Sequence, residues 1–146
     1  MRPLKPGDLD WVVELEQAAM KSPWNKALFA SELEREDSVC LAGLARERGK
    51  EEPAAFAFSR ILMNEMHLLR LAVAPRFRGR GLGRLLTRKS LAKAAAKGAD
   101  TAWLEVRESN TAAQAMYRAE GFDRVGTRRS YYHDTREDAV IMFRRI

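Results

Sequence analysis

Three polar side chains in the second half of the chain are of types that perform acid–base chemistry. Glu105 interrupts an otherwise apolar segment, residues 103–106. A carboxylate in a central strand is partly removed from water and so takes up a proton more readily, which suits a general base near neutral pH. Tyr117 has a hydroxyl that could donate a proton to a leaving group, and Asn110, seven residues earlier, could contact a ligand.

Each of these side chains also has a purely structural interpretation. Glu105 could be held in an ion pair by Arg107 or Arg70. Tyr117 could pack in the core, as helical tyrosines usually do. Asn110 could serve only as the cap of the helix that follows it. The residues alone leave both interpretations open.

A glycine-rich loop, Arg78-Gly79-Arg80-Gly81-Leu82-Gly83-Arg84, is the strongest local signal in the chain. It follows an extended-looking run over residues 68–75 and opens a helical pattern. Strand, glycine loop and helix start together direct backbone N–H groups and the positive end of a helix dipole at one point, where phosphate binds. The flanking arginines add charged donors. The loop therefore predicts a ligand that carries pyrophosphate. The alternatives are an arginine-rich loop that binds nucleic acid and one that is merely exposed to solvent.

Two common phosphate-binding loops do not fit this segment. A Walker A loop needs Gly-Lys followed by Ser or Thr, whereas Arg84-Leu85 follows Gly83. A dinucleotide fingerprint needs a different glycine spacing and an acidic residue at the end of the next strand, and Asp100 precedes that strand.

Length and composition predict an ordinary soluble globular domain. The 146 residues, 46% hydrophobic and 32% charged, predict one domain spanning residues 1–146. No run reaches the length of a membrane span and the N-terminus lacks a signal-peptide core, so we expect a cytoplasmic protein. The net charge of +6 favours anionic partners. Cys40 lies in an apolar run and is expected to be buried, and His67 and His133 lack partners at metal-ligand spacing, so no metal is expected.

Apolar periodicity and turn residues predict a mixed α+β domain around one central sheet. A first helix should begin after Asp8 as its N-cap, and a second after Pro23-Trp24-Asn25, with Leu28, Phe29 and Leu33 facing inward. The remaining elements are expected at residues 39–46, 54–63 and 66–73 (an antiparallel meander), 81–97 (helix), 101–106 (a strand covered on both faces), 111–119 (helix), 122–132 and 139–145 (strands).

The chain resembles the GCN5-related N-acetyltransferases (GNAT). The matching pieces are residues 71–75, the loop 78–83 in the family's (Arg/Gln)-x-x-Gly-x-(Gly/Ala) pattern, residues 103–107 with Ser109-Asn110, Ala115-Met116-Tyr117, Gly121-Phe122, Arg129-Ser130-Tyr131-Tyr132, Glu137-Asp138-Ala139 and Pro23-Trp24. Within the family it is most similar to the bacterial ribosomal-protein alanine N-acetyltransferases. Arg78 stands where close relatives often carry glutamine, which the pattern allows.

The resemblance implies a twisted, mostly antiparallel sheet of about seven strands flanked by about four helices, and acetyl-CoA as cosubstrate. It implies Glu105 as general base and Tyr117 as general acid. Trp24, Tyr131 and Tyr132 could line a groove for the acceptor, or could be ordinary packing. The implied cofactor contacts are Leu71, Ala72 and Val73 for the pantetheine arm, Arg78, Gly79, Arg80, Gly81, Leu82, Gly83 and Arg84 for the pyrophosphate side, and Asn110 near the thiol.

The implied reaction is direct attack of an amine on the thioester in a ternary complex, with a backbone N–H of residues 71–73 stabilising the oxyanion. The implied acceptor is the N-terminal alanine, or a similar small residue, of the eighteenth protein of the small ribosomal subunit. Other peptide N-termini, lysines or a small amine are alternative acceptors. A basic nucleic-acid-binding module remains a distant alternative.

Overall fold

Seven strands form a single sheet in this computed structural model, which describes residues 1–146. Their order across the sheet is β1-β2-β3-β4-β5-β7-β6, and only the β4–β5 pair is parallel. The strands are β1 (Arg2–Pro3), β2 (Ser38–Glu47), β3 (Lys50–Leu62), β4 (Glu65–Val73), β5 (Thr101–Arg107), β6 (Asp123–Arg128) and β7 (Ala139–Arg145). The expected mostly antiparallel sheet of about seven strands is confirmed, and its first three long strands form the expected meander.

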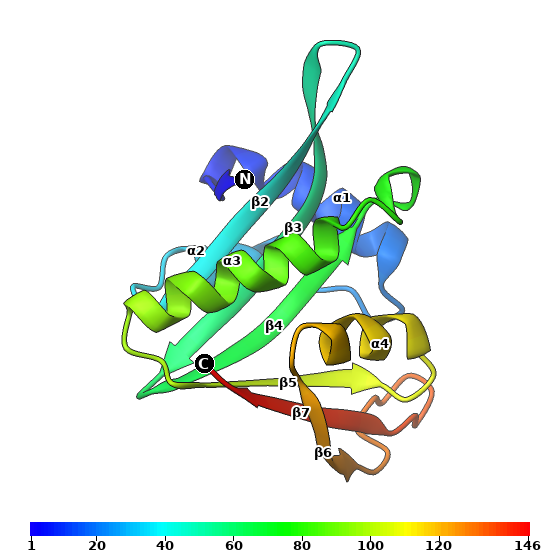
Figure 1. Ribbon diagram of the computed structural model, residues 1–146. Coiled ribbons are helices and arrows are strands. Elements are labelled where there is room, and N and C mark those ends of the chain that lie inside the picture. Colours follow the sequence, from blue (N-terminus) through cyan, green and yellow to red (C-terminus); the bar gives the residue numbers. More distant parts are fainter.

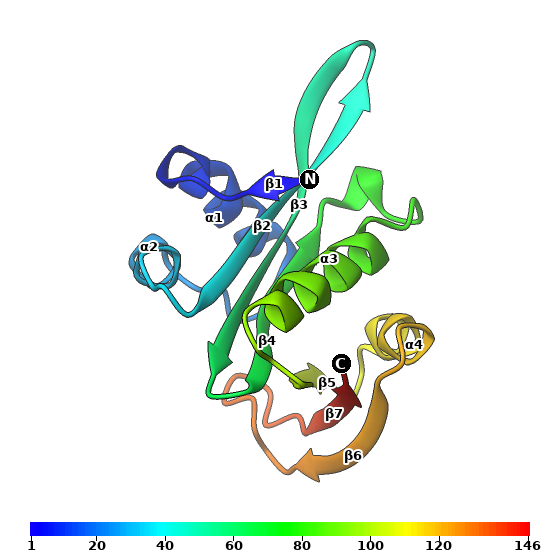
Figure 2. The ribbon, with the colours of Figure 1, turned by 60° about the vertical axis from the view of Figure 1, so that its left-hand side comes forward.

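Four α-helices cover the two faces of the sheet, two on each face (Figures 1 and 2). One face carries α1 (Leu9–Ala19) and α2 (Lys26–Leu33), and the other carries α3 (Leu82–Ala96) and α4 (Thr111–Ala119). Short 3-10 turns at Pro6–Asp8 and Pro75–Phe77 precede α1 and the glycine loop. None of the helices is both long and apolar enough to cross a membrane.

The ends of the helices follow local capping chemistry, with one exception. The Asn25 side chain accepts a hydrogen bond from the Leu28 N–H at the start of α2. Gly98, at φ +95°, ends α3 in the left-handed conformation that favours glycine. Asp8 occupies the expected N-cap position of α1, but its carboxylate accepts no backbone N–H from that helix. It instead binds the guanidinium of Arg2, the first residue of β1.

Each face of the sheet has its own apolar core. The core beneath α3 and α4 includes alternate residues of β5 and β7, such as Leu104 and Met142. The core beneath α1 and α2 is centred on the packed rings of Phe29, Phe56 and Phe58. The expected inward orientation of Leu28 is wrong, since 49% of this residue is exposed.

The sheet splits between β4 and β5. Their parallel pairing runs only from Glu65, opposite Thr101, to Leu68, opposite Leu104. The β3–β4 register shifts directly after this point, so that Leu69 has no partner in β3. Such a bulge bends the strand and changes its twist. Past Leu68, β4 therefore has no neighbouring strand on its β5 side, and a slot opens in the middle of the sheet.

Candidate active site

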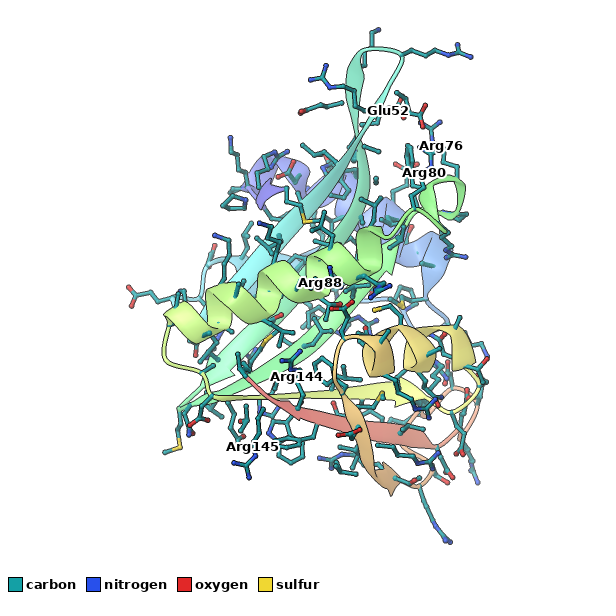
Figure 3. The ribbon with its side chains drawn as sticks, in the orientation of Figure 1. Glu52, Arg76, Arg80, Arg88, Arg144 and Arg145 are labelled. Carbon is teal, nitrogen blue, oxygen red and sulfur yellow. The ribbon has the colours of Figure 1, made fainter.

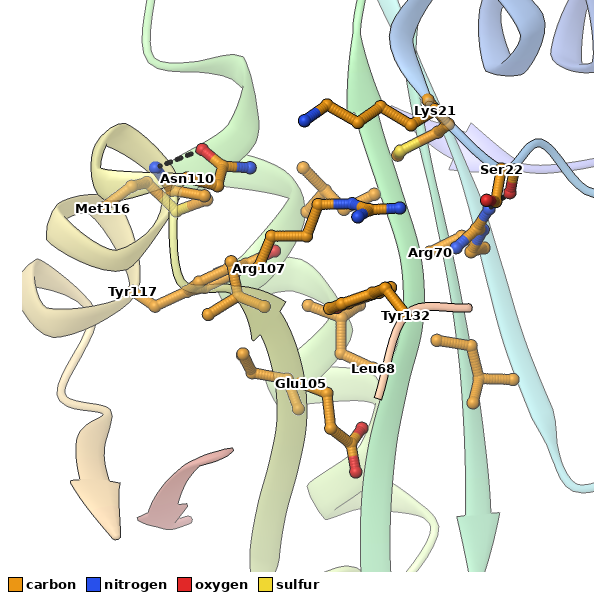
Figure 4. Close-up of a pocket in the computed structure, with 16 residues that line it drawn as sticks. Lys21, Ser22, Leu68, Arg70, Glu105, Arg107, Asn110, Met116, Tyr117 and Tyr132 are labelled. Carbon is orange, nitrogen blue, oxygen red and sulfur yellow. Dashed lines mark hydrogen bonds between the residues drawn. The ribbon is translucent and has the colours of Figure 1, made fainter. Parts of the chain in front are cut away.

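Two cavities meet at the slot. The inner cavity, of about 180 Å³, lies between β4 and β5 (Figure 4). The outer groove, of about 820 Å³, runs from the slot to the glycine loop. They share the residues Met20, Leu71, Asn110, Ala113 and Met116. A ligand in the groove can therefore extend an end into the inner cavity.

The glycine loop forms the far end of the outer groove. Gly79 and Gly81 have φ values of +78° and +79°, which side chains with a Cβ rarely adopt. The backbone N–H groups from Gly79 to Arg84 donate to no acceptor within the protein, and α3 begins without a side-chain cap. Unpaired N–H groups at a helix N-terminus form an anion site. The residues present therefore fit a pyrophosphate group.

The arginines of the loop are held in different ways. Arg78 lines the groove and donates through Nε to the Val73 carbonyl at 3.2 Å. Arg84 also lines the groove, and its Nε donates to Glu120 at 2.7 Å. Arg80 lies outside the groove, where it donates to Glu47 at 2.5 Å. Its predicted contact with the pyrophosphate is therefore not seen in the groove wall.

The free edge of β4 forms one wall of the groove, with Leu71, Ala72 and Val73 lining it. These residues pair with β3 on their other side and have no strand neighbour toward β5. Their free backbone groups can pair with an extended chain in the manner of an added strand. The geometry thus suits a linear arm that contains amide groups.

Glu105 lies on the opposite side of β5 from the α3 and α4 core. Side chains of β5 alternate, with Leu104 and Val106 buried and Glu105 between them half-buried. The expectation of a strand covered on both faces is therefore wrong, and 29% of the Glu105 side chain is exposed. Its ionic partner is Arg128, at 3.4 Å. The partners considered from the sequence, Arg107 and Arg70, are engaged elsewhere.

Tyr117 approaches the inner cavity from α4, on the opposite face of the sheet from Glu105 (Figure 4). It is buried and packs edge-on against Phe122. Its hydroxyl makes no hydrogen bond within the protein. Burial, with a smaller contribution from Tyr132, raises the pKa of Tyr117 well above its usual range. The hydroxyl thus keeps its proton at any physiological pH.

Asn110 lies where the two cavities join. Its Oδ1 accepts a hydrogen bond from the Ala113 N–H at 3.2 Å, shown as the dashed line in Figure 4. The predicted capping of α4 is confirmed. Because the cap uses only the oxygen, the side-chain NH₂ stays available to a ligand.

The three aromatic residues suggested for acceptor binding lie in different places in the structure. Tyr132 lines the inner cavity, with the Arg107 guanidinium 4.0 Å from its ring centre. Burial raises the pKa of Tyr132 to about 12. Trp24 packs on Phe29 and lines neither cavity. Tyr131 is exposed and also lies outside both walls.

A polar network that sequence reasoning missed surrounds the inner cavity. Arg70 donates to the fully buried Glu16 and to the Ser22 carbonyl. Ser22 donates to Asp134, which also accepts from Arg107. These bonds join the α1–α2 connection to the β6–β7 connection across the cavity. The available signal was a charged residue inside a predicted strand, Arg70, and another directly after a predicted strand, Arg107. Their partners are too distant in sequence to be inferred.

The walls of the two cavities contain neither Cys40 nor a metal-binding cluster. Cys40 lines neither cavity, and burial raises the pKa of its thiol to about 12. A buried, protonated thiol is a poor nucleophile. No group of three or more His, Cys, Asp or Glu side chains is placed to hold a metal ion.

Comparisons with known proteins agree with this arrangement. The model of the acetyltransferase (GNAT) family matches residues 9–122. The ribosomal protein bS18-alanine N-acetyltransferase of Escherichia coli (strain K12) is 38% identical over 141 residues, covering 95% of this chain and 92% of that protein. The crystal structure of the ribosomal-protein-S18-alanine N-acetyltransferase from Escherichia coli superposes with a TM-score of 0.86 at 37% identity, over 99% of this chain and 92% of that one. Arabidopsis thaliana NAA60 in complex with acetyl-CoA, 18% identical, shares the fold with a TM-score of 0.90, over 99% of this chain and 97% of that one.

Proposed function

This chain belongs to the GNAT acetyltransferase family, and from that premise we propose that it acetylates the N-terminal alanine of ribosomal protein bS18. It is an N-acetyltransferase that uses acetyl-CoA. The observation that carries the proposal is the junction of a phosphate-binding groove with an inner cavity that contains Glu105 and Tyr117. The choice of acceptor rests on the relatives of more than 30% identity that carry this activity in their names.

The outer groove holds the acetyl donor in this proposal. Acetyl-CoA supplies the acetyl group as a thioester. The N–H groups from Gly79 to Arg84 bind its pyrophosphate, and the free edge of Leu71–Val73 pairs with its pantetheine arm. A backbone N–H of the same edge stabilises the negative charge that develops on the carbonyl oxygen. Asn110 contacts the donor near its thiol end, where the groove joins the inner cavity.

Glu105 prepares the acceptor. An α-amine has a pKa of about 7.7–8.0, so a large part of it is protonated and unreactive at neutral pH. The Glu105 carboxylate lies at the slot and takes this proton, directly or through a water molecule. Its partial exposure leaves a path for the proton to reach solvent.

Tyr117 assists the departing thiolate. A thiol has a reference pKa of about 8.5, below that of a tyrosine even without burial. The buried Tyr117 hydroxyl therefore acts by donating a hydrogen bond to the sulfur as negative charge builds up on it, and it keeps its own proton when the thiolate leaves. Its lack of a competing protein partner leaves this hydrogen bond free for the ligand.

The acceptor enters from the face of the sheet opposite to α3 and α4. Glu105 and Arg107 project to that face, and Tyr132 and the Ser22–Asp134 hydrogen bond lie beside them. Neither Trp24 nor Tyr131 forms part of the cavity wall. In this proposal they contribute to acceptor binding only through the loops that carry them. Family membership favours this reading over a nucleic-acid-binding module.

An acceptor experiment tests the proposal. Purified protein is incubated with acetyl-CoA and full-length bS18, and the N-terminal peptide is analysed by mass spectrometry. We expect one acetyl group on the α-amine of alanine. Matched acceptors are bS18 with its first residue changed to tryptophan and bS18 with a blocked N-terminus, and both should stay unmodified. Acetylation confined to lysines, or to other N-termini or small amines in a parallel screen, would replace the proposed acceptor with one of the alternatives.

A further inference from the structure

A buried carboxylate lies directly behind the arginine of the donor groove. Glu120, at the C-terminal end of α4, is 6% exposed. Its Oε1 accepts from Arg84 Nε at 2.7 Å and its Oε2 from Arg88 Nε, also at 2.7 Å. Its backbone carbonyl accepts from Arg144 at 2.5 Å. Arg88 on α3 and Arg144 on β7 are labelled in Figure 3.

The two arginines that share the Glu120 carboxylate differ in their surroundings. Arg84 lies in the first turn of α3 and lines the donor groove, whereas Arg88, one turn later, does not. Each arginine uses only its Nε for the carboxylate, so the terminal nitrogens of Arg84 have no protein partner. A guanidinium that is fixed along one edge still presents donors along the other edge.

The carboxylate is ionised despite its burial. Burial favours the neutral form, but hydrogen bonds from Arg88 and Arg84 outweigh it and hold the pKa of Glu120 below its usual range. Two arginines facing one charge also leave a net positive charge beside the groove. An oriented guanidinium loses less rotational freedom on binding phosphate than a mobile one does.

We propose that Glu120 is a positioning residue for the acetyl donor, which holds the Arg84 guanidinium with its terminal nitrogens directed at the phosphate groups. This rests on the proposed donor site and is independent of which acceptor is used. Glu120 touches no ligand itself and acts through Arg84. The role accounts for a buried acidic residue at the end of a helix that packs beside an anion site.

A purely structural role would give a different result. α3 and α4 also touch through Met116, which packs near Gly83 and receives a weak hydrogen bond from Thr87. The interface thus has apolar contacts that do not involve Glu120. If Glu120 only joined the helices, its loss would lower the melting temperature. It would then affect the binding of ligands with and without phosphate equally.

Calorimetric titration with CoA tests the proposal without measuring turnover. Glu120→Gln should weaken CoA binding roughly tenfold, a loss typical of one charge-assisted hydrogen bond. Arg84→Gln should weaken it at least as much, and the double variant should be no weaker than Arg84→Gln alone. Additive losses in the double variant would overturn the proposal, because Glu120 would then act by another route.

Two matched controls complete the experiment. Arg88→Gln removes the second partner of Glu120 but nothing that lines the groove, and should change CoA binding less than twofold. With S-acetyl-pantetheine, which lacks the pyrophosphate, Glu120→Gln should leave KM unchanged. An equal rise of KM for acetyl-CoA and for S-acetyl-pantetheine would also contradict the proposal.

If Glu120→Gln does not fold, Glu120→Asp is measured in its place, with a smaller loss that is again confined to CoA. Failure of the wild-type protein to bind CoA would refute the donor site itself, which separates the two hypotheses.

Discussion

The Glu105 carboxylate stands between the slot and Arg128, so its removal should affect the chemical step and spare donor binding. For Glu105→Gln we expect kcat to fall roughly 10²-fold or more, the usual contribution of a general base. The dissociation constant of CoA should change less than twofold, since no donor contact is assigned to Glu105. Steady-state kinetics and calorimetry measure the two quantities.

Glu108→Gln is the matched control for Glu105. Glu108 lies three residues later, is about half exposed and pairs with Arg124 at 3.6 Å, outside both cavities. Its turnover should equal that of the wild type. Equal losses in both variants would mean that charge in this region matters generally and that Glu105 has no special role.

Tyr117→Phe removes one hydroxyl and keeps the buried ring packed against Phe122. We expect kcat to fall roughly 10²-fold with an unchanged circular dichroism spectrum. Because burial raises the pKa of Tyr117 above its usual value, the hydroxyl stays protonated as the pH rises, and wild-type kcat should show no loss from its ionisation up to about pH 10. Turnover of the variant within twofold of the wild type would remove Tyr117 from the mechanism.

For single residues, the sequence predicted which candidate side chains lie together better than it predicted what surrounds each of them. Glu105, Asn110 and Tyr117 all line the inner cavity. The predicted partial removal of Glu105 from water agrees with its half-buried position. The predicted cover on both faces of its strand was wrong, because an apolar segment does not reveal that one of its faces lies beyond the reach of α1 and α2. Its partner Arg128 comes from β6, two strands away, and long-range pairs of this kind have no local signature.

Among the elements, β1 depends most on a single side chain. Asp8 accepts hydrogen bonds from Arg2, from the Lys5 N–H and from Trp11, and so fixes this two-residue strand to the start of α1. The hydrogen bond from Arg2 is the largest cause that holds the pKa of Asp8 well below its usual range. A depressed folded-state pKa stabilises the fold above the unfolded value, near 3.9, and the stabilisation is lost as pH falls through the folded value.

Asp8→Asn should therefore lower the free energy of unfolding by about 2 kcal/mol at pH 7. The difference from the wild type should shrink as the pH falls below about 4, where the Asp8 carboxyl of the unfolded chain begins to take up its proton while that of the folded protein stays ionised. Urea denaturation at pH 7 and pH 3 measures both values. Asp10→Asn is the control, because Asp10 is almost fully exposed in its ion pair with Lys26 and should contribute little. A difference that is constant with pH would contradict the ion-pair explanation.

Helices and long strands were predictable because their patterns are local. α2 and α4 begin at asparagine caps, and α3 ends at Gly98, as the sequence indicated. β1 was missed because two residues carry no periodicity. The final hairpin was predicted too long, since β6 ends at Arg128 and the chain turns through Ser130, whose φ is +48°. Only tertiary contacts impose that conformation on a serine.

For the whole molecule, we propose that residues 1–146 form a single domain. One sheet contains both β1, near the N-terminus, and β7, near the C-terminus, and both cores pack on it. Thermal unfolding monitored by far-ultraviolet circular dichroism and by tryptophan fluorescence should therefore give coincident transitions. The tryptophans sample both halves, with Trp11 on α1 and Trp103 on β5. Two separated transitions would indicate two independently folding units.

Both substrates should be bound together when the acetyl group is transferred. The two cavities join at the slot, and the sole cysteine lies outside them. Initial-velocity plots against one substrate at several concentrations of the other should intersect, as direct transfer requires. Parallel lines would indicate an acetylated enzyme instead. Cys40→Ala should retain kcat within twofold.

The sheet, its helices and its family could be foreseen, but the slot could not. Its position is set by the bulge at Leu69 and by pairing that stops at Leu68. Leu69 is an ordinary apolar residue in an apolar strand, so nothing in its type marks it. The energy of a bulge depends on twist and packing across several strands, and these exist only in the folded sheet.

The split between β4 and β5 also separates the proposed donor side of the site from the proposed acceptor side. The donor side draws on β4, α3 and α4, whereas the acceptor side draws on the connections that carry Ser22 and Asp134. Substitutions in those connections reach the donor groove only through the few residues common to both cavities. Changes in these two surface connections can therefore alter the choice of acceptor while the proposed acetyl-CoA groove stays unchanged.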